Sequence, residues 1–144
     1  MNDELYHQAI LELAKRARKA SRLEAPQASV TVDNPLCGDR VTLDLTLADG
    51  RVREVGHSVR GCLLCQAAAT AIGERAPGET PEALRSVARD LGQAIAGAPD
   101  AVGRRWPELD AFAPVHAHKS RHECVLLPFA ALTQALDEIE ANVA

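Results

Sequence analysis

The sequence predicts an α+β fold in which a three-stranded antiparallel sheet carries helices packed on one face. Two alternating segments joined by a tight turn indicate a hairpin, a short alternating segment precedes them, and helical patterns lie on both sides. The 144 residues suit one domain, residues 1–144, that buries a core without disulfides. Because only 3% of the residues are aromatic, that core must be mainly aliphatic.

The N-terminal part predicts a helix followed by a short strand. Apolar residues recur at helical spacing from about Asp3 to Ala20, and Pro26 then interrupts the chain. From Ser29 to Asp33, valines alternate with polar residues, which is typical of a strand.

The hairpin is the clearest element. Residues alternate strictly from Arg40 to Leu47, and Asp49-Gly50 is a strong turn signal. The return strand runs from Arg51 to Arg60. Its apolar spacing shifts after Val52, which predicts a β-bulge near residues 54–56.

Three helices are predicted after the hairpin. The first, from Leu63 to Ile72, carries no charge and should be buried nearly all round. The second begins at a Thr80 cap followed by proline and reaches about Ala96. The third spans Val125 to Ala141, with Pro128 tolerated only in its first turn. The intervening segment, residues 97–119, is rich in proline and glycine and is expected to be irregular.

Composition argues against several functions. The formal net charge is −4 without blocks of like charge, so nucleic-acid or anionic-membrane binding has no support. No apolar stretch approaches the roughly 20 residues that span a bilayer, and the acidic N-terminus does not resemble a signal peptide. We therefore expect a soluble, cytoplasmic protein.

In the cytoplasm thiols stay reduced, so four cysteines favour metal binding or a reactive thiol over disulfides. The alternative is that a buried cysteine acts as a small apolar residue. Cys37, Gly38 and Asp39 place a thiol and a carboxylate on either side of a flexible residue. Cys62 falls at the start of a predicted helix, where the helix dipole favours a thiolate, and Cys124 falls just ahead of the last helix.

Cys37 and Asp39 lie in the loop between the first two predicted strands, so the three cysteines Cys37, Cys62 and Cys124 all lie at ends of predicted elements, which can meet in the folded chain. Three thiolates and a carboxylate suit a closed tetrahedral zinc site or an iron–sulfur ligand set, and ligand identity alone does not decide between them.

Other candidates are weaker. Cys65 lies three residues after Cys62 and could approach the same centre, or it could be a small core residue. His122 is the best histidine candidate because it lies near Cys124; His116 and His118 could be ligands or merely solvated. His57 lies in a predicted strand and is expected to be structural.

These motifs resemble a known family. Asn34-Pro35-Leu36-Cys37-Gly38-Asp39, then Gly61-Cys62, then Cys124 are similar to the U-type iron–sulfur cluster assembly proteins, the IscU, SufU and NifU N-terminal group. The long segment between Cys62 and Cys124 resembles the SufU subgroup. Arg121 matches an Arg-x-Lys-Cys motif of that subgroup, but Glu123 replaces the lysine.

The resemblance implies zinc bound through Cys37, Asp39, Cys62 and Cys124, with Cys37 accepting persulfide sulfur. The donor would be a pyridoxal-phosphate (PLP)-dependent, SufS-like cysteine desulfurase, and the recipient a downstream iron–sulfur assembly complex. Such a protein is a sulfur carrier rather than a stand-alone enzyme. The alternative is an IscU-type scaffold that assembles a [2Fe–2S] cluster on the same residues.

Overall fold

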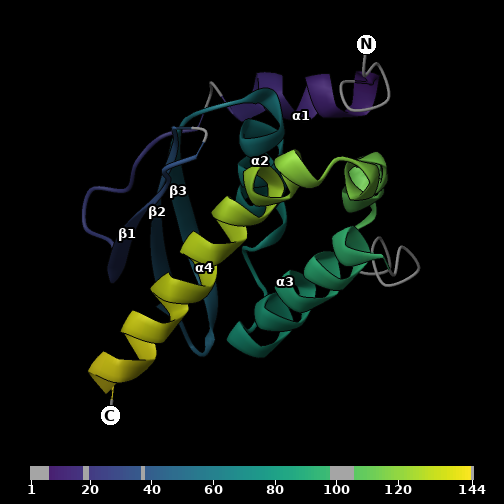
Figure 1. The fold of residues 1–144 in the computed structure, drawn as a ribbon. Coiled ribbons are helices and arrows are strands. Elements are labelled where there is room, and N and C mark those ends of the chain that lie inside the picture. Colours follow the sequence, from purple (N-terminus) through teal and green to yellow (C-terminus); the bar gives the residue numbers. More distant parts are fainter. Residues whose placement is uncertain (1–6, 18–19, 37, 98–105, 144) are drawn as a thin grey trace.

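The computed structural model describes residues 7–17, 20–36, 38–97 and 106–143 and has the predicted α+β fold (Figure 1). Its sheet has the antiparallel order β1-β2-β3. The elements in chain order are α1 (Gln8–Ala17), β1 (Ala28–Asn34), β2 (Asp39–Ala48), β3 (Arg51–Arg60), α2 (Leu63–Arg75), α3 (Pro81–Ala96), the 3₁₀ segments η3 (Pro107–Ala117) and η4 (Lys119–Arg121), and α4 (His122–Val143).

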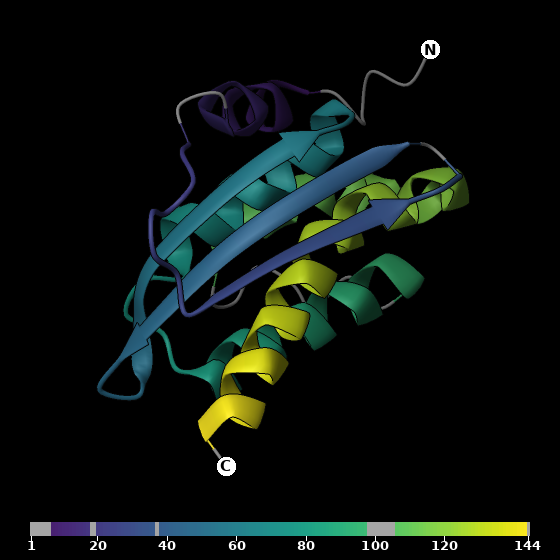
Figure 2. The ribbon, with the colours of Figure 1, turned by 90° about the vertical axis from the view of Figure 1, so that its left-hand side faces the viewer.

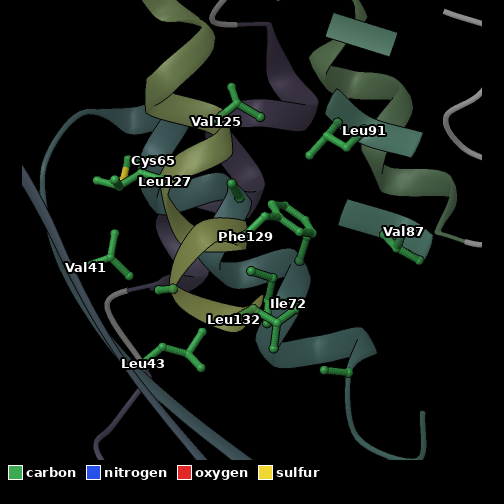
Figure 3. Packing of buried hydrophobic residues seen from close by; sticks show 14 of the residues in the cluster. Val41, Leu43, Cys65, Ile72, Val87, Leu91, Val125, Leu127, Phe129 and Leu132 are labelled. Carbon is green, nitrogen blue, oxygen red and sulfur yellow. The ribbon is translucent and has the colours of Figure 1, made fainter. Parts of the chain in front are cut away.

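Helices α2 and α4 lie on one face of the sheet, and α3 packs against α4 on the side away from the strands (Figures 1 and 2). In Figure 3 the apolar side chains of α4 lie between Val41 and Leu43 of β2 and Val87 and Leu91 of α3. All four of these flanking residues are buried. The aliphatic core predicted from the composition is therefore present.

The opposite face of the sheet is crossed by residues 20–27, which connect α1 to β1 (Figure 2). A Cβ placed on Gly56 would lie 2.7 Å from the carbonyl oxygen of Ser21, so this connection runs directly over β3. Asp44 points to this face, as the alternation predicts, yet it is fully buried because Arg22 and the backbone of Leu23 cover it.

The predicted bulge lies slightly earlier in β3 than expected. Thr46 pairs with Glu54 and Leu47 pairs with Val52, so Arg53 is the extra residue. Because of this extra residue, the apolar side chains before and after the bulge point to the same face of the sheet.

The prediction of an irregular segment over residues 97–119 is wrong for residues 107–117, which form η3. Its buried side chains, together with Trp106, fall at every third position, which matches the three residues per turn of a 3₁₀ helix: Trp106, Leu109, Phe112 and Val115.

Helix α4 begins at His122, before the predicted start at Val125. Pro128 therefore lies in its second turn rather than its first, a further correction. Proline has no N–H, so the carbonyl of Cys124, four residues earlier, loses its usual helical donor. Among the described residues, no helix is long and apolar enough to cross a membrane.

Candidate metal centre

Strand register positions Asp39. Arg40 pairs with Arg60, so the preceding residue, Asp39, lies across from Gly61 just beyond the end of β3. Side chains two positions apart share a face of the sheet, so Asp39 points to the same side as Val41, where the helices pack. Its side chain is buried, with the residue only 4% exposed.

Cys62 is the N-cap residue of α2, at the predicted helix start. Its backbone N–H donates to Asp39 Oδ1 at 3.2 Å, and its thiol donates to Asp39 Oδ2 at 3.6 Å. The carboxylate is thus held at the positive end of the helix dipole, beside the thiol.

Cys124 lies inside the first turn of α4, not ahead of the helix as predicted. The residue is 1% exposed. Burial raises the pKa of the Cys124 thiol above its ordinary value, and the nearby Cys62 and Asp39 raise this pKa further. A hydrogen bond from Arg121 opposes this rise without reversing it. A buried thiol with acidic neighbours ionises readily only if a cation balances the charge.

The donor atoms of Asp39, Cys62 and Cys124 all lie within 4.8 Å of one another. Two ligands of a tetrahedral zinc ion, a carboxylate oxygen and a sulfur, would be about 3.5 Å apart if zinc bonds have their usual lengths. The separation of 3.6 Å between Cys62 Sγ and Asp39 Oδ2 is close to that value. The residues present therefore fit a single metal ion.

Cys37, the fourth predicted ligand, lies outside the described residues. The residues on either side of it form a tight turn: Gly38 N–H donates to the carbonyl of Asn34 at 2.8 Å, and Leu36 N–H donates to Asn34 Oδ1 at 3.0 Å. Gly38 has a φ of 78°, which glycine adopts without strain. Assignment of all four ligands stays a prediction.

The weaker candidates do not enter this group. Within the described residues, the three donors that lie together include neither Cys65 nor a histidine. Cys65 is fully buried in the hydrophobic core. The ring Nε2 of His122 bonds the carbonyl of His116, whose own ring bonds the carbonyl of Ile95.

His57 is buried against α2, where burial lowers the pKa of its imidazole and favours the neutral form. Its position agrees with the structural role expected from the sequence. Glu123 is exposed beside Cys124.

Sequence reasoning assigned no role to Arg121 beyond its match to a motif. Arg121 lies three residues before Cys124, about one helical turn. This spacing is the sequence signal that could have predicted the hydrogen bond between them. The sequence also did not predict that Gly61 lies against Asp39, because this contact depends on strand register.

Comparisons with known proteins identify relatives of this chain. A family model described as NifU-like N terminal domain matches residues 5–104. The iron–sulfur cluster assembly scaffold protein IscU of Thermotoga maritima is 27% identical over 135 residues, 94% of each chain. The zinc-dependent sulfurtransferase SufU of Bacillus subtilis is 25% identical over 140 residues, 97% of this chain and 95% of that protein.

Among solved structures, the N-terminal part of a nitrogen-fixing NifU-like protein from Brucella abortus superimposes with a TM-score of 0.91 at 32% identity, covering 96% of both chains. IscU and SufU relatives match at similar identity, so placement in the SufU subgroup stays a prediction. The match over residues 5–104, with the fold and the chain-length likeness, shows that this chain belongs to the NifU-like N-terminal domain family, the family of IscU and SufU.

Proposed function

We propose that this chain is an iron–sulfur cluster assembly protein that binds zinc through Cys37, Asp39, Cys62 and Cys124. In this proposal Cys37 accepts persulfide sulfur from a PLP-dependent, SufS-like cysteine desulfurase. The observation that carries the proposal is the convergence of one carboxylate and two thiols within 4.8 Å at the end of the sheet.

The compactness of this group favours one ion over a two-iron cluster. A [2Fe–2S] cluster divides its four protein ligands between two irons, so three ligands cannot all share one iron. Ligands on different irons lie farther apart than ligands of the same ion. The name of the Bacillus subtilis relative, a zinc-dependent sulfurtransferase, points the same way.

Bound zinc would keep the coordinating thiols deprotonated near neutral pH. In the transfer step, the Cys37 thiolate attacks the outer sulfur of the desulfurase persulfide. A new S–S bond forms on Cys37, the S–S bond of the donor persulfide breaks, and the donor cysteine leaves as a thiolate. Sulfane sulfur moves without net oxidation or reduction. Because the sulfur stays on Cys37 until an acceptor takes it, we propose that the chain is a sulfur carrier in the cytoplasm rather than a stand-alone enzyme. The sulfur then passes to a downstream iron–sulfur assembly complex.

The second candidate is a scaffold on which a [2Fe–2S] cluster is assembled by the same residues. The Thermotoga maritima relative, named as a scaffold, favours it. The two candidates differ in what the purified protein holds. About one zinc per chain, with no cluster absorbance after addition of iron and sulfide, supports the carrier. A stable cluster spectrum supports the scaffold.

The deciding experiment combines metal analysis with transfer of ³⁵S from labelled cysteine through a cysteine desulfurase. We expect Cys37→Ala to abolish label on the chain. Cys65→Ala is the matched control, because it removes a buried thiol that does not belong to the donor group. Labelling of Cys37→Ala at the wild-type level would overturn Cys37 as the acceptor.

A further inference from the structure

Gly61 lies against the carboxylate of Asp39. An added Cβ at this position would meet Asp39 Oδ1 at 2.6 Å, Cγ at 2.8 Å and Cβ at 3.1 Å. The first two separations are shorter than real Cβ contacts. The space that a side chain at position 61 would need is therefore filled by Asp39.

Backbone conformation does not explain the glycine. The glycines with positive φ in the described residues are Gly38, Gly50, Gly78 and Gly97, and Gly61 is not among them. Gly61 therefore does not use the left-handed conformation that favours glycine, and the requirement for glycine that the structure shows is one of space.

Asp39, rather than the backbone, would have to move if a methyl group were added. The carbonyl of Gly61 accepts a hydrogen bond from Gln66 Nε2 at 2.9 Å, and the next N–H, that of Cys62, is directed at Asp39. The peptide is thus fixed to α2 on one side. A carboxylate that rotates about its own side-chain bonds gives way more easily than this anchored backbone.

The two oxygens of Asp39 have separate tasks in this space. Oδ1 accepts the Cys62 N–H, and Oδ2 faces the thiol of Cys62 within the group that also contains Cys124. With Oδ1 engaged by the backbone, Oδ2 is the oxygen directed toward a metal ion. Hydrogen bonds of this kind orient metal ligands and are worth 10–100-fold in metal affinity.

We infer that Gly61 is a positioning residue of the metal centre: its missing side chain leaves the space in which Asp39 directs a single oxygen at the ion. This inference rests on the proposed metal-binding function. It predicts that Gly61→Ala removes the carboxylate from the donor set while leaving the thiols in place.

The test compares the full-length wild type with Gly61→Ala, Asp39→Ala and the double variant. Zinc affinity is measured by chelator competition, and Co²⁺ absorption reports the donor types. We expect Gly61→Ala to lower zinc affinity by about 10–100-fold. Its Co²⁺ ligand-field bands should shift as in Asp39→Ala, with the sulfur-to-cobalt charge-transfer band retained. The double variant should match Asp39→Ala, because the clash disappears with the carboxylate.

Two glycine controls separate this effect from general damage. Gly92→Ala in α3 meets no atom within 4 Å, and Gly73→Ala meets His57 Nε2 at 2.9 Å, remote from the centre. Both should bind zinc like the wild type, although Gly73→Ala should be less stable. If Gly61→Ala fails to fold, the double variant still decides, since it is expected to fold and bind like Asp39→Ala.

The outcomes distinguish the inference from the proposed function. If Gly61→Ala kept the wild-type zinc affinity and Co²⁺ spectrum while Asp39→Ala bound zinc more weakly, the positioning role of Gly61 would be overturned and the metal-binding function would stand. A double variant that binds zinc much more weakly than Asp39→Ala would also overturn it. Absence of zinc and Co²⁺ binding in the wild type would overturn the metal-binding function itself.

Discussion

Aspartates close together in the sequence have very different environments in this protein. The Asp33 side chain is 50% exposed and pairs with Arg40 at 2.6 Å. Asp39, which pairs with Asn34 across the first two strands, is 4% exposed and faces Cys62 and the centre. Burial of a carboxylate is costly unless it gains hydrogen bonds or a cation. Asp39 gains hydrogen bonds from Cys62, and the proposed metal ion would supply the cation.

At this residue scale, Asp39→Ala is expected to weaken zinc binding. The substitution removes one predicted ligand. Removal of a group that only orients a ligand costs about 10–100-fold in metal affinity, so we expect zinc affinity to fall on the order of 100-fold, the upper end of that range. Chelator competition measures it. Glu123→Gln is the matched control, because it removes a negative charge beside Cys124 from an exposed site. Unchanged zinc affinity in Asp39→Ala would indicate that another residue supplies this ligand, and His122 would be the first to test.

At the scale of elements, one buried carboxylate binds the connection between α1 and β1 to the sheet, alongside backbone hydrogen bonds such as that from the Gln27 N–H to the carbonyl of Leu45. Asp44 accepts hydrogen bonds from Arg22 at 2.6 Å, from Ser29 at 2.7 Å and from the Leu23 N–H at 2.9 Å. Burial alone would raise the pKa of Asp44, but these hydrogen bonds outweigh it and hold that pKa below its ordinary value.

The lowered pKa of Asp44 makes the stability of the fold depend on pH. Because the pKa of Asp44 is lower in the folded protein than in the unfolded chain, ionised Asp44 stabilises the fold fully above the unfolded value of about 3.9. The contribution is lost as the pH falls from there through the lower folded-state pKa. Stability in the acid range, below about pH 4, therefore depends partly on this residue.

Asp44→Asn should lower the free energy of unfolding by roughly 1–3 kcal/mol at neutral pH, because a charged acceptor is replaced by a neutral one. It should also flatten the acid limb of the stability profile. Urea denaturation between pH 3 and pH 7 measures both effects. Asp33→Asn is the matched control, since its ion pair with Arg40 is half exposed and should change stability by less than about 1 kcal/mol. Equal losses in the two variants would contradict the role of burial.

At the scale of the whole molecule, the candidate centre joins segments that are distant in sequence. Asp39 opens β2, Cys62 caps α2 and Cys124 lies in the first turn of α4. An ion that binds all three only in the folded state links the sheet to two helices. Its binding free energy then adds to the stability of the fold.

Zinc should therefore raise the melting temperature. At a free zinc concentration 100 times the dissociation constant, the gain is about 2.7 kcal/mol, or roughly 5–10 °C for a chain of this size. Differential scanning calorimetry with and without a chelator measures it. Magnesium, which prefers oxygen ligands, is the control ion and should leave the transition unchanged. A melting temperature insensitive to zinc would contradict a closed site made from these elements.

Much of this architecture could be predicted from local sequence. The alternation from Arg40 to Leu47 and the Asp49-Gly50 turn depend only on neighbours in the chain, and both appear in the hairpin. The Thr80 cap is also local: its side chain accepts the Ala83 N–H. The period of three from Trp106 to Val115 is also present in the sequence, but the proline and glycine content of this segment led to the prediction of irregular structure.

The fold class, the order of the strands and α-helices, and the residue types able to bind a metal could all be predicted from the amino-acid sequence, because they follow from periodicity, turn chemistry and ligand chemistry. The folded structure was needed to show that Asp39, Cys62 and Cys124 meet, that Cys124 lies within a helix, and that Asp44 is buried. Those outcomes depend on strand register and on how α4 and the α1–β1 connection pack across the sheet, which are contacts between residues far apart in the chain.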